Sequence, residues 1–262
     1  MTTNFVGKAV ALGDDGLQAA LDLLGVTAPA FCAVLQVETS GCGFLASRKP
    51  KILFERHVFS RLTDHQFDRD APDVSNKAPG GYGQGGDAQY ARLHKAMALA
   101  HDEALMSASW GLGQLMGEHA KDLGFADVDE MVSAMCESEA AQVAAMAKFI
   151  DGKGLAKALG TRNWPRFAEG YNGSNYQINH YDTRLASSFE ALSRGALPNL
   201  RVRAAQVYLT FLGFDPHGVD GVMGRMSRAA MNEFQGSKGL PATDVLDDAI
   251  LRALRDAIDR LV

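Results

Sequence analysis

Residues 28–44 read APAFCAVLQVETSGCGF and join a helix pattern to an abrupt turn. Pro29 suits the first turn of a helix. Phe31, Val34 and Glu38 then recur at the spacing of one helix face. A Gly-Cys-Gly sequence ends the pattern. The stretch therefore predicts an apolar helix whose last turn carries a carboxylate.

Most of the remaining sequence also has helical periodicity. A compact apolar run at 51–59 is the exception, and we interpret it as a short extended element that leads into a helix. Residues 71–89 hold five glycines and two prolines, which indicates an irregular loop. We expect a mainly α fold, with helices at 16–25, 28–38, 88–105, 111–124, 129–150 and 179–192.

Bulk composition limits the classes of function. Of 262 residues, 47% are hydrophobic and 22% are charged, as in a soluble globular protein. The net charge of −5 gives no basic field for nucleic acid, so we expect no nucleic-acid partner. No apolar stretch approaches ~18 residues, so we expect neither membrane insertion nor a signal peptide.

The cysteines and histidines indicate no metal or other cofactor. Three cysteines match no zinc spacing, and no His-Glu-x-x-His sequence occurs. We expect buried free thiols, with a Cys32–Cys42 pair as the alternative in an oxidising compartment.

A boundary is expected near residues 193–200, where Gly195 and Pro198 interrupt the helical pattern. Beyond it the pattern predicts three helices, at 200–212, 226–236 and 247–261. We therefore divide the chain into a catalytic domain at 1–194 and a small three-helix bundle at 195–262.

Glu38 is the first candidate catalytic residue. The negative end of the helix dipole and the apolar neighbours both disfavour ionisation, so both raise a carboxyl pKa. A general acid needs such a pKa in order to hold its proton near neutrality. The alternative is an ordinary surface glutamate beside a glycine C-cap.

Two further motifs contain residue types that suit a sugar groove. SASWGLGQLMG supplies Ser109, Trp110 for ring stacking and Gln114 for hydrogen bonds to acetamido groups. YNGSNY supplies Tyr171, Asn172 and Tyr176 among other polar groups. The alternatives are a core tryptophan and an Asn-Gly turn.

Taken together, these motifs resemble the phage endolysin N-acetylmuramidase family, and more loosely goose-type lysozymes and lytic transglycosylases. The resemblance covers 16 to about 192, including VETSGCGFL, PKILFERHVFSRLT, SASWGLGQLMG and FAEGYNGSNYQINHYDTRLA. It implies a lysozyme-like helical domain with a small extended or hairpin element. It also implies that Glu38 protonates the glycosidic oxygen.

Hydrolysis by a water nucleophile calls for a second carboxylate. Glu55, within the apolar stretch ILFERH, is our candidate because carboxylates are costly there unless used or paired. The alternative is a salt bridge to Arg56 or Arg48. Glu103, Glu118 and Asp182 are weaker rivals because each fits a solvated helix face.

Residues 201–254 resemble the common three-helix peptidoglycan-binding domain. The Asp220-Gly221 turn and Gly224 before the next helix are the matching features, and they could present backbone donors to a wall carboxylate. Arg225 stands where that family usually has proline, which is a departure from its pattern.

The sequence thus predicts a monomeric endolysin that binds peptidoglycan and hydrolyses the β-1,4 bond between N-acetylmuramic acid and N-acetylglucosamine. We expect it to wait in the host cytoplasm and to act on the wall, in the periplasm, after release. Two alternatives stay open: a lytic transglycosylase that forms anhydromuramic products, and a non-catalytic wall-binding or virion protein.

Overall fold

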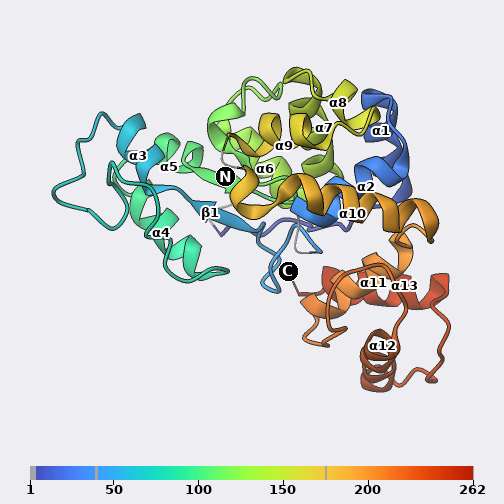
Figure 1. Cartoon of the computed structure of the whole chain (residues 1–262). Helices are drawn as coiled ribbons and strands as arrows, with labels where there is room; N and C mark the ends of the chain where they lie inside the picture. Colours follow the sequence, from blue (N-terminus) through green and yellow to red (C-terminus); the bar gives the residue numbers. More distant parts are fainter. Residues whose placement is uncertain (1–3, 39–40, 175, 262) are drawn as a thin grey trace. The chain divides into compact units, whose positions relative to one another are not determined.

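The computed structural model describes residues 4–38, 41–174 and 176–261. The chain forms two compact units, and each combines segments that are distant in sequence. The first consists of Met1–Ala9 and Gly43–Gly152, and the second of Val10–Cys42 and Lys153–Val262. Helices dominate both units, and the described residues form one three-stranded sheet (Figure 1). The fold is mainly α, as the sequence predicts.

The small sheet belongs to the first unit and is antiparallel. It contains β1 (Ile52–Phe54), β2 (Ala108–Trp110) and β3 (Leu115–Met116), in the order β1-β2-β3. Ile52 pairs with Trp110 and Phe54 with Ala108. β1 leads directly into α3 (Arg56–Leu62), so the extended element followed by a helix is confirmed.

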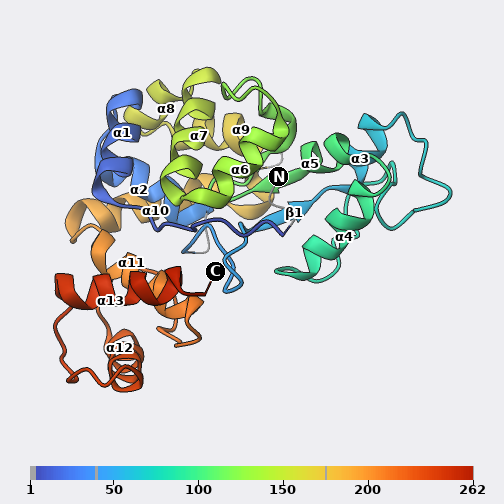
Figure 2. The same ribbon diagram turned by 180° about the vertical axis from the view of Figure 1, so that it is seen from behind.

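Around the sheet the first unit places helices whose apolar faces pack together. They are α3, α4 (Ala88–Met97), α5 (His101–Met106), the 3₁₀ helix η1 (Gly117–His119), α6 (Val128–Glu137) and α7 (Glu139–Gly152). Figure 2 shows α6 beside α7, and it shows the long loop that joins α3 to α4. Asp127 caps α6 by accepting a hydrogen bond from the backbone N–H of Glu130 at 2.8 Å.

Three expected helices of the first unit need correction. The expected helix at 129–150 is two helices, α6 and α7, because the backbone is extended at Ser138. The expected helix at 111–124 is wrong, because this stretch forms the β2–β3 turn, β3 and η1. Gly111 and Gln114 take positive φ angles of 66° and 46°, which a right-handed helix cannot include. The expected helix at 88–105 is two helices, α4 and α5, separated after Met97.

The second unit is entirely helical in its described part. Its first six helical elements are α1 (Asp14–Leu24), α2 (Ala28–Glu38), α8 (Ala156–Gly160), α9 (Trp164–Asn172), the 3₁₀ helix η2 (Tyr176–Asn179) and α10 (Tyr181–Arg194). Gly25 ends α1 in a left-handed conformation, φ 61°, as the sequence predicts. α10 lies along α2 (Figure 1), and Leu192 packs there against Cys32 and Ala33. This packing fixes the end of α2, where Glu38 stands.

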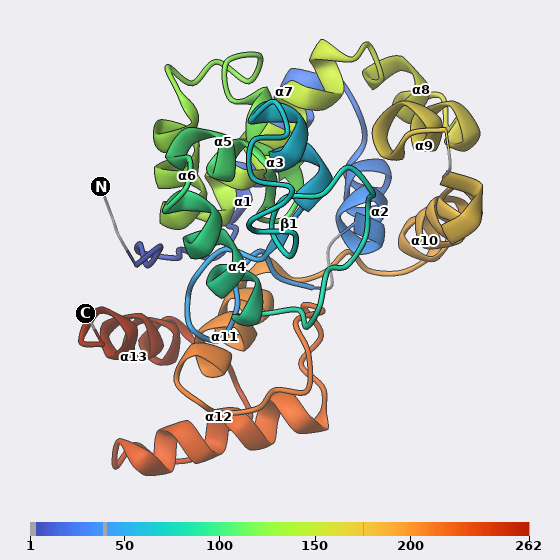
Figure 3. The same ribbon diagram turned by 90° about the vertical axis from the view of Figure 1, so that its left-hand side faces the viewer.

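The same unit contains three C-terminal helices. They are α11 (Leu200–Phe211), α12 (Arg225–Ser237) and α13 (Asp248–Asp259), which Figure 3 shows together and which confirm the three predicted segments. Within this unit, Arg203 of α11 donates to the carbonyl of Gly41 at 2.7 Å, and the Tyr208 hydroxyl accepts from the N–H of Ala11 at 3.3 Å. Helix α11 therefore forms hydrogen bonds with the segment before α1 and with the segment after α2.

All three cysteines are free and buried, as predicted. Among the described residues, no single helix is both long and apolar enough to cross a membrane. α1 and α2 reach that threshold only as a pair, and a bend of 109° separates them.

Candidate active site

Glu38 is the last residue of α2, and two neighbouring helices position its surroundings. From α10, Arg184 donates to the carbonyl oxygen of Val37 at 3.1 Å, which satisfies one of the free carbonyls at the end of α2. From the end of α9, the Asn172 side-chain nitrogen lies 3.1 Å from each carboxyl oxygen of Glu38. The acid is thus held by one amide donor from a facing helix.

The environment of Glu38 favours a protonated carboxyl. The side chain is half-buried, and desolvation raises its pKa from 4.5 to about 7. The Asn172 hydrogen bonds and the Arg184 charge lower the pKa, but burial outweighs both. A carboxyl with this pKa is partly protonated at neutral pH and can donate a proton to a leaving oxygen.

The aromatic residues beside Glu38 contribute to the desolvation. Tyr171 stacks on Phe167, with ring centroids 5.6 Å apart. Burial raises the pKa of the Tyr171 hydroxyl well above 10, and the negative charge of Glu38 raises it further. Tyr171 therefore stays a neutral phenol beside the acid. The same two effects, in the same order, raise the pKa of Tyr181 at the start of α10.

One acceptor in this cluster has no partner. The Asn172 side-chain oxygen is buried and receives no hydrogen bond in the described structure. An amide side chain can present either its nitrogen, as a donor, or its oxygen, as an acceptor, to the same neighbour. If the amide turns over, that oxygen can accept the proton of a neutral Glu38. Asn172 can therefore hydrogen bond with either protonation state of the acid.

Glu55 stands at the junction between β1 and α3 in the first unit. Its backbone N–H donates to the carbonyl of Ser107 at 2.9 Å, and its side chain is 16% exposed. One carboxyl oxygen lies 3.1 Å from Nδ1 of His57, but the angle does not make a hydrogen bond, and both atoms lack other hydrogen-bond partners among the described residues. Glu55 thus has a histidine nitrogen close to one carboxyl oxygen, and that oxygen is still an acceptor that is not satisfied.

The loop between α3 and α4 brings Tyr82 to Glu55. The pKa of the Tyr82 hydroxyl is raised by burial first, and then by the charge of Glu55 and a hydrogen bond to it. The loop is held in place by Gln89, whose side-chain nitrogen donates to the carbonyls of Tyr82 and Gln84 at 2.7 and 2.6 Å. Arg92 also donates to the Tyr82 carbonyl, at 2.9 Å.

The sequence analysis did not identify Tyr82, Gln89 or Arg92 as neighbours of Glu55. Their signal was the glycine-rich sequence GGYGQGG at residues 80–86. Its second glycine allows a close approach, because a Cβ at Gly81 would lie 2.6 Å from the guanidinium carbon of Arg56. The sequence predicted an irregular loop here and matched YGQGG to the family resemblance, but it assigned no contact with Glu55 to these residues.

The sugar-stacking role of Trp110 is wrong. Its side chain is completely buried, and its indole N–H donates to the carbonyl of Leu105 at 3.1 Å. Phe5 lies against it, with ring centroids 5.8 Å apart. With no exposed face, Trp110 is a core residue that anchors β2, which was the alternative considered for this motif.

Ser109 and Gln114 belong to the β2–β3 hairpin. The Ser109 hydroxyl donates to the Gln114 side-chain oxygen at 2.9 Å, and the Gln114 nitrogen donates to the carbonyls of Gly111 and Lys51 at 2.8 and 3.2 Å. These bonds stabilise a turn with positive φ at Gln114. Contact of these two side chains with sugar stays a prediction.

The YNGSNY motif has both described and undescribed members. Tyr171 and Asn172 lie at Glu38, whereas Tyr176 begins η2, is half-buried, and accepts a hydrogen bond from the side chain of Gln177 at 3.4 Å. The second asparagine of this motif, Asn175, and Thr39 and Ser40 of the VETSG motif lie outside the described residues. A sugar contact by Tyr176 stays a prediction.

In the C-terminal helices, the buried Gln206 organises the predicted wall-binding turn. Its side chain accepts from the N–H groups of Asp220 and Gly221 at 3.0 and 2.9 Å, and donates to the Asp220 carboxylate at 2.8 Å. Gly221 needs to be glycine, because φ is 74° and a Cβ would lie 2.8 Å from Pro198. Gly224 is the N-cap residue of α12, and Arg225 is the exposed first residue of this helix. Wall contact by this turn stays a prediction.

One set of described residues has the geometry for a metal ion. Ligand atoms of His101, Asp102 and Asp129 lie within 4.8 Å of one another. Both aspartates lie in the first turn of a helix, where the dipole stabilises a negative charge without a metal. The helix dipoles and the pairing of His101 with Asp129 at 3.2 Å therefore explain the set.

Comparisons with known proteins identify the families to which the two parts of the chain are similar. A family model described as N-acetylmuramidase matches residues 27–193, and one described as a putative peptidoglycan binding domain matches residues 199–254. Among solved structures, the crystal structure of Burkholderia AP3 phage endolysin is 42% identical, with a TM-score of 0.66. The match covers 70% of this chain and 71% of that one. A search of curated proteins finds no match.

Proposed function

The chain belongs to the N-acetylmuramidase family, and on this premise we propose a catalytic role for each of two half-buried carboxylates, Glu38 and Glu55. It is a peptidoglycan-hydrolysing enzyme of the endolysin type. The bond cleaved is the β-1,4 bond between N-acetylmuramic acid and N-acetylglucosamine.

Glu38 is the general acid. The observation that carries this role is a carboxyl that burial holds at a pKa of about 7, with one amide donor touching both oxygens. Breaking the glycosidic bond places negative charge on the leaving oxygen, and a proton from Glu38 neutralises it. Proton donation of this kind typically contributes roughly 10²–10⁴-fold to the rate.

Glu55 serves the second half of the reaction. Its oxygen beside His57 is buried and lacks a hydrogen bond, so it can accept one from a water molecule. We assign Glu55 to the positioning and deprotonation of the water that attacks the sugar. His57 and Tyr82 hold the carboxylate in one orientation.

The products distinguish hydrolysis from the transglycosylase alternative. Purified peptidoglycan is digested with the protein, and the fragments are analysed by mass spectrometry. Hydrolysis leaves reducing muramic ends. Anhydromuramic ends would reject the role of Glu55, because an intramolecular hydroxyl would then replace water. No new ends at all would reject the enzyme.

We also propose a division of labour within the chain, with catalysis at 1–194 and wall binding at 195–262. The ranges of the two family matches support this boundary. The proposed wall-binding residues are Asp220, Gly221, Gly224 and Arg225, in a turn that Gln206 holds in place and in which Asp220 and Arg225 are exposed. Tethering to an insoluble polymer raises the local concentration of substrate.

The finer setting of the activity follows from the endolysin relationship. We propose that the protein acts as a monomer on the cell wall, reaching it from the host cytoplasm after release, and that nucleic acid is not a partner. Peptidoglycan itself is the partner that the C-terminal family match supports.

A further inference from the structure

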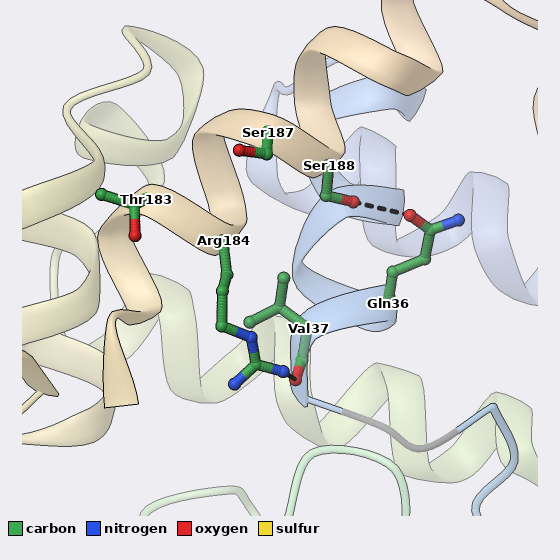
Figure 4. Close-up of a pocket in the computed structure, with 6 residues that line it drawn as sticks. All are labelled: Gln36, Val37, Thr183, Arg184, Ser187 and Ser188. Carbon is green, nitrogen blue, oxygen red and sulfur yellow. Dashed lines mark hydrogen bonds between the residues drawn. The ribbon is translucent and has the colours of Figure 1, made fainter. Parts of the chain in front are cut away.

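A polar groove lies between α2 and α10, next to the end of the helix that carries Glu38. Its volume is about 400 Å³, and Figure 4 shows the six residues that line it: Gln36, Val37, Thr183, Arg184, Ser187 and Ser188. None of them is assigned to proton transfer. Val37 directly precedes the acid in sequence, so a group in this groove is adjacent to Glu38.

Arg184 is the charged member of the groove, and it is held in a defined position. It donates to the carbonyl oxygen of Val37 at 3.1 Å, and its guanidinium carbon lies 5.4 Å from the centre of the Tyr181 ring. The residue is nevertheless exposed. A guanidinium has five N–H donors, so donors remain for a ligand. Because its position is already fixed, binding a ligand costs little side-chain entropy.

The other polar side chains add donors rather than negative charge. Ser188 donates to the side-chain oxygen of Gln36 at 2.6 Å, which orients the Gln36 nitrogen away from that bond (Figure 4). The Ser187 hydroxyl forms no hydrogen bond within the described part of the chain. Thr183 donates to the carbonyl of His180 at 3.0 Å. No carboxylate lines the groove.

A fixed guanidinium with neighbouring amide and hydroxyl donors is suited to a carboxylate, which Arg can bind through two parallel hydrogen bonds. In peptidoglycan, carboxylates belong to the short peptides attached to muramic acid, whereas the sugar rings are neutral. The groove and the acid are neighbours, so the peptide would belong to a muramic acid close to the bond that is cut.

We propose that this groove binds a carboxylate of the stem peptide on the glycan, and that Arg184 makes the enzyme prefer peptide-bearing glycan over bare glycan. This inference rests on the proposed function, because it assumes that glycan is cut at Glu38. It assigns substrate selection to a surface of α10, separate from the residues that transfer protons.

The test compares two substrates: glycan chains that retain their stem peptides, and the same chains after an amidase has removed the peptides. The readout is the ratio of the two kcat/KM values. Because a hydrogen bond to a charged group contributes about 1.5–3 kcal/mol, we expect a ratio of roughly tenfold or more for the unchanged protein. Arg184→Gln should bring the ratio close to one. Using a ratio removes any common effect of this substitution on Glu38.

Arg194→Gln is the matched control, since Arg194 is an exposed arginine on the same helix and pairs only with Glu190 among the described residues, at 3.4 Å. Arg194→Gln should have the same ratio of kcat/KM values as the unchanged protein. Ser187→Ala removes a hydroxyl without an internal partner among the described residues, so it should fold normally and lower the ratio by roughly tenfold or less, in line with the loss of one hydrogen bond to a charged group. If Arg184→Gln is inactive on both substrates, the ratio measured for Ser187→Ala tests whether the groove selects the peptide.

The outcomes separate the two proposals. If the unchanged protein cleaves both polymers equally, or if Arg184→Gln or Ser187→Ala keeps the full ratio, the groove does not select the peptide and the proposed function stands. If the unchanged protein cleaves neither polymer, the proposed function fails, and the groove proposal fails with it.

Discussion

Glu38 and Glu55 are both half-buried carboxylates, yet their neighbours differ in kind. Glu38 stands at the end of α2 among tyrosines, and one amide group, from Asn172, touches its two oxygens. Glu55 stands at the start of α3, with His57 at 3.1 Å and Tyr82 hydrogen-bonded to it. Burial dominates the first environment, whereas pairing partners surround the second.

This difference shows how one residue type can perform two roles. A glycosidase that uses water needs one carboxyl group that holds a proton and one carboxylate that takes a proton. Desolvation that outweighs the nearby Arg184 charge favours the protonated form, as for Glu38. A histidine and a phenol beside Glu55 can instead stabilise a negative charge. The comparison therefore predicts unequal effects when each group is altered.

The largest effect is expected from Glu38→Gln, which keeps the shape of the side chain and removes the proton. We expect kcat on purified peptidoglycan to fall by roughly 10³-fold, the middle of the range for general acid catalysis. Cosedimentation with cell walls should be unchanged. An unaltered rate would mean that the protein hydrolyses peptidoglycan without this acid, and the role of Glu38 would be wrong.

Glu55→Gln should have the next largest effect. We expect kcat to fall by about 10²-fold, the low end for a general base. Glu118→Gln is the matched control, because Glu118 pairs with Arg61 at 2.7 Å and was a weaker candidate in the sequence. The control should stay within about twofold, as is usual for a surface ion pair. Equal rates for Glu55→Gln and Glu118→Gln would show that Glu55 has only a structural role.

Asn172→Ala sharpens the comparison by removing the amide donor from Glu38. The hydrogen bonds from Asn172 lower the pKa of Glu38, so their loss should raise it above its value of about 7. Because the acid must be protonated, activity falls as pH rises through this pKa. The alkaline limb of the kcat/KM profile should therefore move to higher pH, with a loss of about tenfold in kcat from poorer orientation. A limb that moves to lower pH would contradict this role.

Tyr82→Phe should give the smallest effect. It removes the hydroxyl beside Glu55 and keeps the ring. The loss of one hydrogen bond to a charged group, about 1.5 kcal/mol, should lower kcat roughly tenfold or less. The alkaline limb set by Glu38 should stay in place, because the substitution acts on the other carboxylate. A shifted limb would show that Tyr82 acts on the acid instead.

Much of this arrangement was predictable from local sequence. The helix at 28–38 and the acid in its last turn follow from periodicity and from the glycines after it. The role of Asn172 as a partner of Glu38 was not predictable, because 134 residues separate them and only the packing of α9 brings them together. The YNG sequence was recognised as a motif, but its side chains were expected to contact sugar rather than Glu38.

Other errors have a common physical origin. Trp110 can serve as a core residue or as a stacking platform, and composition alone does not distinguish the two; burial against Phe5 decides for the core. The stretch 111–124 has helix-forming residues, but positive φ angles at Gly111 and Gln114 turn it back along β2. Tertiary packing overrides local preference at both places.

The most direct test of the account is the pKa of Glu38 itself. Glutamate labelled with ¹³C at the side-chain carboxyl allows its titration to be followed by NMR, and Glu38→Gln identifies the resonance. The account predicts a midpoint of about 7, against an ordinary value of 4.5. A midpoint at or below 4.5 would show that Glu38 is ionised at neutral pH and has no proton to give, and the assignment of the acid would be wrong.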